Sequence, residues 1–106
     1  MNAARSLSTA RAASGYLAVV TPTCDRAEGL ARAAVGDTRT AQALLTRAAA
    51  GFDRMSVPLQ AARSTECLAR VCPDDAEELL RTALQSYASL GAKRDAARAE
   101  SALAAG

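Results

Sequence analysis

The sequence contains no histidine, tryptophan or isoleucine, and its 106 residues include one phenylalanine and two tyrosines. Without histidine the chain cannot build a Ser-His-Asp triad, a Cys-His nucleophile pair or a histidine-containing zinc site. The shortage of β-branched and aromatic side chains disfavours a β-sheet fold, because pleated faces pack through such side chains. These absences argue against an enzyme and favour a helical protein.

What the chain has instead is alanine and leucine. Of its apolar residues, 28 are alanine and 12 are leucine. Alanine is the strongest helix former, and its small side chain lets helices approach closely. The length corresponds to one small domain. We therefore expect a single all-α domain over residues 1–106.

Charge is balanced along most of the chain. Residues 1–24 contain Arg5 and Arg11 and no acid, whereas residues 25–106 contain eleven basic and eleven acidic side chains. No basic stripe is present that could neutralise a row of phosphates, so direct nucleic-acid binding is not expected. No apolar run approaches the length of a bilayer span or of a secretory signal. We expect a cytoplasmic protein without membrane contact, although the acid-free start also fits a transit peptide.

The three cysteines do not form a metal motif. Cys24, Cys67 and Cys72 include no CxxC pair, and no histidine is present to complete a zinc site. On one helix, residues five apart lie about 140° around the axis and about 8–9 Å apart, too far for a disulfide. We expect reduced, packed thiols and no cofactor or metal.

The strongest internal signal is a repeat with a period of 35 residues. Residues 41–71 and 76–106 are identical at nine of 31 positions, including two adjacent leucine pairs and one arginine pair. A period of about 34 is typical of tetratricopeptide (TPR) repeats, each of which is a helix–turn–helix. The period predicts an antiparallel helical-hairpin array of about five to six helices.

Turn and cap residues place the helix boundaries. Thr21 and Pro22 favour a helix start, Asp37 is a good N-cap, Pro73 suits a first helical position, and Gly91 suits a C-terminal cap. The expected elements are hairpins over 22–54 and 57–90 and a capping helix over 92–104, after a weakly patterned N-terminal helix and join over 1–20. The helices within them are expected at 2–14, 22–35, 38–54, 57–71, 73–90 and 92–104, with an interruption at 15–21.

Spacing also predicts which side chains face inward. On the helix over 22–35, four residues at helical spacing should be buried: Ala27, Leu30, Ala31 and Ala34. Phe52 and Tyr87 share one phase of the repeat, and we expect both as wedges between helices rather than as ligand contacts. On the last helix the outward residues should be Lys93, Arg94, Asp95, Arg98 and Ser101. Four acidic residues after Pro73 should stabilise a helix N-terminus rather than bind metal, namely Asp74, Asp75, Glu77 and Glu78.

A further pattern resembles a known family. The pattern begins with a run of the type A-L-L-x-x-A, continues with an aromatic residue and the pair L-G, and ends with A-A-R-A-E. The residues that fit it here are Leu79, Leu80, Ala83, Tyr87, Leu90, Gly91, Ala96, Ala97, Arg98, Ala99, Glu100 and Leu103. Residues 27–106 resemble the TPR-like α-helical region of the large ATP-binding LuxR-type bacterial transcriptional regulators, the maltose-activator-like group. The resemblance implies a bacterial scaffold for contact or effector sensing. No GxxxxGK[ST] loop is present, so the ATPase activity of that family does not carry over, and neither does its DNA binding.

Three arginines are the candidate binding residues. Arg63 and Arg98 recur in phase, and Arg70 follows Arg63 by one heptad, so all three could line a groove and hold a carboxylate of a partner. The alternative is local pairing of Arg63 with Glu66 and of Arg98 with Asp95.

The function expected from these observations is a non-enzymatic protein–protein interaction module. It would be a free-standing or detached relative of the LuxR-type helical region. The alternative is a small regulatory sensor that binds a small-molecule effector in its groove. Because only 22 apolar side chains exceed alanine and cysteine in size, the core is thin, and we expect a protein partner or self-association to add stability.

Overall fold

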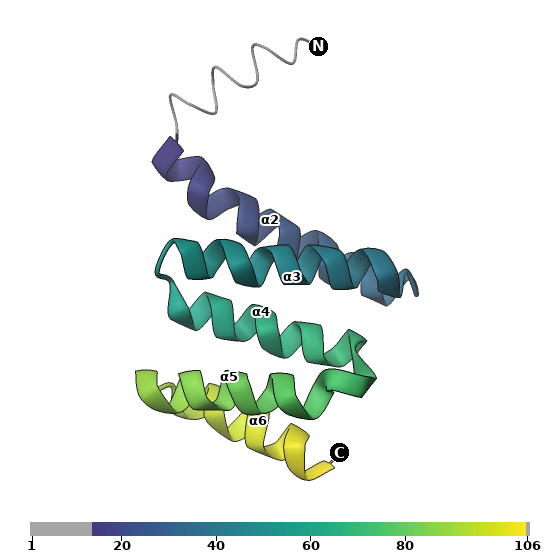
Figure 1. Cartoon of the computed structure of the whole chain (residues 1–106), viewed down its shortest axis with the longest axis vertical. Helices are drawn as coiled ribbons and strands as arrows, with labels where there is room; N and C mark the ends of the chain where they lie inside the picture. Colours follow the sequence, from purple (N-terminus) through teal and green to yellow (C-terminus); the bar gives the residue numbers. More distant parts are fainter. Residues whose placement is uncertain (1–13, 106) are drawn as a thin grey trace.

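The computed structural model describes residues 14–105, and every regular element in that range is helical (Figure 1). The elements are α2 (Ser14–Ala34), α3 (Thr38–Arg54), α4 (Pro58–Val71), the 3₁₀ turn η1 (Pro73–Asp75), α5 (Ala76–Leu90) and α6 (Lys93–Ala105). The predicted all-α class is thus confirmed. The helix predicted over 2–14 lies almost entirely outside the described residues. Within that part of the chain, no helix is long and apolar enough to cross a membrane.

The helices stack in chain order. Each packs against the next, and α2 also touches α4 (Figure 1). The starts of α4 and α6 keep the 35-residue spacing, at Pro58 and Lys93, whereas α3 and α5 begin 38 residues apart, at Thr38 and Ala76. The arrangement places side chains of α2, α4 and α6 around one pocket, while α3, α4 and α5 line another.

Caps and left-handed residues end the helices. Asp37 caps α3 as predicted, since its Oδ1 accepts a hydrogen bond of 3.3 Å from the backbone N–H of Thr40. Gly91 ends α5 with φ of 72°, also as predicted, and Ser56 after α3 adopts φ of 56°. Pro73 opens a 3₁₀ turn rather than the predicted α-helix, because the Asp75 N–H bonds to the Cys72 carbonyl three residues back.

The predicted interruption at 15–21 is wrong, because α2 runs without a break from Ser14 to Ala34 with Pro22 inside it. Proline removes one backbone donor and crowds the preceding turn. Here its ring is buried against α3 at Gly51, where a Cβ atom would lie 2.7 Å from the proline Cγ. Burial of the ring in the space left by the glycine offsets part of the lost hydrogen bond.

The predicted inward face of α2 is also wrong. Its four apolar residues (Ala27, Leu30, Ala31, Ala34) are all exposed, whereas Gly29 is buried. A Cβ atom at Gly29 would lie 2.9 Å from Cγ of Leu45, a fully buried residue of α3. The two helices therefore meet through the residues that allow the closest approach, and these are not the most apolar ones.

Phe52 and Tyr87 are core wedges, as predicted, with 1% and 0% of their surface exposed. Each organises a small cluster. Around Phe52 lie Ala48, Ala61 and Val57. Around Tyr87 lie Ala62, Ala83, Ala99, Leu59, Leu84, Ala92 and Ala96. The core is thus built mostly from alanine around one aromatic ring in each half.

Candidate functional site: an arginine-lined pocket

The structure brings the three candidate arginines to one open pocket of about 340 Å³ between α2, α4 and α6. Its lining residues are Arg26 and Leu30 from α2, Arg63, Glu66, Cys67 and Arg70 from α4, and Asp95 and Arg98 from α6. We call this the arginine pocket.

Helical spacing explains how each element supplies its part of the lining. The four α4 residues follow the i, i+3, i+4, i+7 pattern, which places them on one face. The α2 and α6 residues are four and three apart, so each pair also shares a face. Packing of consecutive helices then turns these three faces toward one another.

Glu66 is the central carboxylate of the pocket, with only 4% of its surface exposed. Its Oε1 accepts hydrogen bonds from the Tyr87 hydroxyl at 2.6 Å and from Arg98 Nη2 at 2.8 Å. Its Oε2 accepts one from Arg98 Nε at 2.7 Å and lies 4.0 Å from Arg70 Nη2. This single side chain therefore ties α4 to both α5 and α6.

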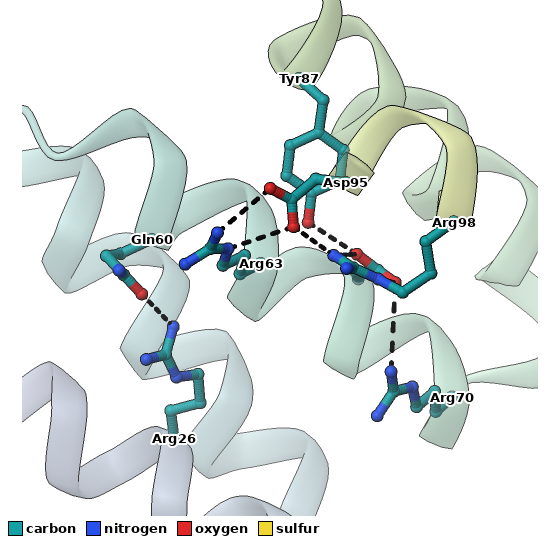
Figure 2. Close-up of polar contacts among 8 residues, drawn as sticks. Arg26, Gln60, Arg63, Arg70, Tyr87, Asp95 and Arg98 are labelled. Carbon is teal, nitrogen blue, oxygen red and sulfur yellow. Dashed lines mark hydrogen bonds and ion pairs between the residues drawn. The ribbon is translucent and has the colours of Figure 1, made fainter. Parts of the chain in front are cut away.

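Asp95 is the second buried carboxylate. Arg63 donates to it from Nε at 3.2 Å and from Nη2 at 3.1 Å, and Arg98 donates to it from Nη2. In Figure 2, Arg63 and Arg98 reach Asp95 from opposite sides. The outward position predicted for Asp95 is wrong, because two guanidinium groups compensate the cost of burying its charge.

The predicted local pairs have opposite outcomes. Arg98 does pair with Asp95 three residues earlier, as predicted. Arg63 does not pair with Glu66. It reaches across to α6 instead, because Asp95 offers both oxygens to the planar guanidinium fork while Arg98 occupies Glu66.

The ion pairs fix the charge states of the pocket. The hydrogen bond from Arg98 lowers the pKa of Glu66, and the one from Arg63 lowers the pKa of Asp95. Bonding to Glu66 raises the pKa of Arg98, while burial raises the pKa of the Tyr87 hydroxyl. At neutral pH both carboxylates are ionised and the phenol stays a neutral donor.

Cations outnumber anions around the pocket. Four guanidinium groups face two carboxylates, which leaves a net charge of +2. The excess belongs mainly to Arg26 and Arg70. Among the described residues, the one hydrogen-bond acceptor of Arg26 is the neutral Gln60 Oε1, at 2.5 Å, and its guanidinium lies 5.4 Å from the centre of the Phe52 ring. The Arg70 side chain is 62% exposed, and its carboxylate contact is the 4.0 Å approach to Glu66.

The sequence does not identify Arg26, because its pattern predicts the wrong inward face for α2. Leu30, four residues later, does line the pocket, but at its exposed rim. Arg26 has no counterpart in the 35-residue period, since the residue 35 positions later is Ala61. The signal in the sequence that points to Arg26 is its i, i+4 spacing from Leu30, which places both residues on one face of the helix.

Elsewhere the structure offers less chemistry. A smaller pocket of about 220 Å³ adjoins the arginine pocket and shares Glu66, Arg70 and Arg98 with it. The four predicted N-terminal acids lie in η1 and the first turn of α5, as expected. Between residues 14 and 105, no group of three or more Cys, Asp or Glu side chains is placed to hold a metal ion. All three cysteines are unpaired thiols, but the predicted packing is wrong for Cys24, which is exposed.

Comparison with known proteins gives no relative. No protein-family model matches the chain, and no significantly similar curated protein or solved structure was found.

Proposed function

We propose that the chain is a non-enzymatic protein–protein interaction module whose contact surface is the arginine pocket and its rim. The observation that carries the proposal is the excess of two positive charges at an open pocket formed by three helices. Both buried carboxylates are already bound by arginines, which lower the pKa values of Glu66 and Asp95, so neither is suited to act as a general acid or base at neutral pH.

The composition of the rim supports a protein partner. Arginine is enriched among residues that dominate binding energies, and interfaces combine such residues with apolar contacts. Here Leu30, 39% exposed, lies beside the arginines. The adjoining pocket with Ala69, Leu80 and Ala102 extends the same surface toward the end of α6. A partner segment could therefore bind the arginines through a charged group and the neighbouring apolar residues through its own apolar side chains.

A regulatory setting is part of this proposal. The sequence resemblance to the helical region of LuxR-type regulators supports a cytoplasmic bacterial module that is free-standing or detached from such a regulator. A neighbouring reading frame that encodes the ATPase part of such a regulator would support this setting.

The test compares two exposed leucines. A photo-crosslinking amino acid replaces Leu30 at the pocket or Leu90 on α5, which has similar exposure but does not line the pocket. We expect a discrete protein adduct in cells of the source organism from position 30 and not from position 90. An adduct with the mass of a second copy would identify self-association as the contact. Equal adducts from both positions, or none from position 30, would count against the proposal.

The second candidate function is a small regulatory sensor. It is favoured by the four arginines that line this pocket of about 340 Å³, which suit a small anionic effector. Native mass spectrometry of the protein purified from its source separates the two. A retained small-molecule mass that disappears in Arg70→Gln supports the sensor, whereas a retained protein supports the interaction module.

A further inference from the structure

We propose that the arginine pocket is an oxyanion site that binds a phosphate monoester group. The inference rests on the proposed use of this face for binding, and it names the chemistry that the face recognises. A phosphate monoester carries about 1.5 to 2 negative charges at pH 7 and three strong acceptor oxygens. The pocket offers a net charge of +2 and four guanidinium groups from three helices.

Charge balance favours phosphate over carboxylate. A single carboxylate would neutralise only half of the excess of four cations over two anions. The excess is also local, because residues 25–106 contain equal numbers of basic and acidic side chains. A surface that followed a nucleic-acid backbone would need a row of such sites. One concentrated site fits one doubly charged group.

Donor geometry supports the same ligand. A guanidinium carries five N–H donors, and Arg63 uses those of Nε and Nη2 on Asp95. Among the described residues its Nη1 has no acceptor, and Arg70 has no contact to an acceptor shorter than its 4.0 Å approach to Glu66. Arg70 and Arg26 come from different helices, α4 and α2, and lie to either side below Arg63 and Arg98 in Figure 2. Donors thus approach the pocket from more than one direction.

Most of the site is already ordered. Arg63 and Arg98 are held by buried carboxylates, and Arg26 is held by Gln60 and the Phe52 ring. Binding therefore costs little side-chain entropy at these three positions. Arg70 is the adaptable member, because its side chain is 62% exposed. It is also the best residue to mutate, since the fold does not depend on its contacts.

The experiment titrates the full-length ¹⁵N-labelled chain with inorganic phosphate and with acetate at constant ionic strength. We expect saturable phosphate binding at least roughly tenfold tighter than acetate binding, with shifts centred on α4 and α6. Arg70→Gln should weaken phosphate binding roughly tenfold, the usual effect of losing a hydrogen bond to a charged group. The phosphate affinity of Arg70→Lys should lie between those of the unmodified protein and Arg70→Gln, because lysine keeps the charge but loses the planar guanidinium.

The matched control is Arg81→Gln on α5, which removes the same charge from an exposed pair with Glu77 outside the pocket. Its phosphate affinity should equal that of the unmodified protein. The affinity for a phosphate monoester should also fall as the pH drops through about 6, where such a group loses its second charge. Equal affinities for phosphate and acetate, or equal losses in Arg70→Gln and Arg81→Gln, would overturn the proposal. Either result leaves the crosslink at position 30 intact as a separate test of protein contact.

A second arm identifies the source of the phosphate. A phosphoserine peptide that binds at least tenfold tighter than inorganic phosphate, and tighter than its unphosphorylated twin, places the group on a protein partner. If the peptide and inorganic phosphate bind with equal affinity, the phosphate group recognised by the pocket belongs to a free small ligand. No binding by either probe overturns the site.

Discussion

The two halves of this molecule are held together by different physical means. Between α2 and α3 the contact is steric, with Gly29 against Leu45 and Gly51 against Pro22. Between α4, α5 and α6 the apolar cluster around Tyr87 is joined by a polar network, with Glu66 and Asp95 buried among arginines and the Tyr87 hydroxyl. The first half also has an ion pair, from Arg47 to Asp25 at 3.3 Å, but its carboxylate is more exposed than Glu66 or Asp95.

This difference shows how an alanine-rich chain compensates for a thin core. Where glycine allows two backbones to approach, dispersion contacts suffice and no polar group is buried. Between α4 and α6, long arginine side chains bridge the helices to buried carboxylates, and the stems of such side chains can cover apolar surface. Three of the four arginines at the pocket belong to this second half, and α2 of the first half adds Arg26.

We call α4, α5 and α6 the polar half of the molecule, and α2 and α3 the steric half. The largest effect should come from removing the carboxylate of Glu66 in the polar half. Glu66→Leu leaves the buried Tyr87 hydroxyl without an acceptor and removes the partner of Arg98. We expect a loss of about 2–4 kcal/mol in the free energy of unfolding, measured by urea denaturation.

Two variants calibrate that loss. Glu66→Gln keeps an acceptor oxygen and should cost less than Glu66→Leu. Glu77→Gln breaks an exposed pair with Arg81 and should change the free energy of unfolding by less than about 0.5 kcal/mol. If Glu66→Leu were as mild as Glu77→Gln, the polar network would not hold the second half together.

The steric half should respond to a single methyl group. Gly51→Ala places a Cβ atom 2.7 Å from the Pro22 Cγ, and the proline ring cannot move aside. We expect destabilisation of about 1–3 kcal/mol despite the better helix propensity of alanine.

The neighbouring Ala50 provides the control, because it is exposed on the same helix. Ala50→Gly should cost about 1 kcal/mol from helix propensity alone. Both exchanges, Gly51→Ala and Ala50→Gly, would thus destabilise the steric half. A stabilising Gly51→Ala would show that α2 does not pack tightly on α3.

The sequence predicted α3 to α6 better than it predicted α2. Periodicity and caps located α3 to α6 within a few residues, and the repeat phase marked Phe52, Tyr87, Arg63 and Arg98. These signals are local or come from one chain segment compared with another. The α2 predictions were wrong because proline usually marks a helix start and leucine usually faces inward. The proline rule is overridden because Gly51 on α3 makes room for the Pro22 ring, and the leucine rule because α2 turns its own Gly29 toward Leu45.

The site was predicted only in part for a similar reason. Arg63, Arg70 and Arg98 were selected by phase, but their partners depend on tertiary geometry. Local spacing pairs Arg63 with Glu66, whereas the fold brings it to Asp95 on another helix. Buried carboxylates cannot be recognised from a sequence in which most acids lie on the surface.

Acid should weaken the polar half before the steric half. The pKa values of Glu66 and Asp95 are lowered by the arginines from ordinary values of 4.5 and 3.8. Their contribution is therefore complete above pH 5 and is lost as the pH falls below these values. Amide hydrogen exchange should show protection in α5 and α6 declining first. Glu66→Gln should flatten this acid dependence, and uniform loss across all helices would contradict the comparison.

The smallest expected effect concerns the turns that end α3 and α5. Ser56 and Gly91 both have positive φ, but only glycine adopts this conformation without steric cost. Ser56→Gly should therefore stabilise the protein by about 0.5–1 kcal/mol, and Gly91→Ala should destabilise it by about 1 kcal/mol. Thermal melting of both variants would check the pair. Because a Cβ atom at Gly91 meets nothing within 4 Å, any loss there reports backbone strain rather than a clash. Opposite signs at these two positions, 35 residues apart, would show that the same turn conformation ends both helices.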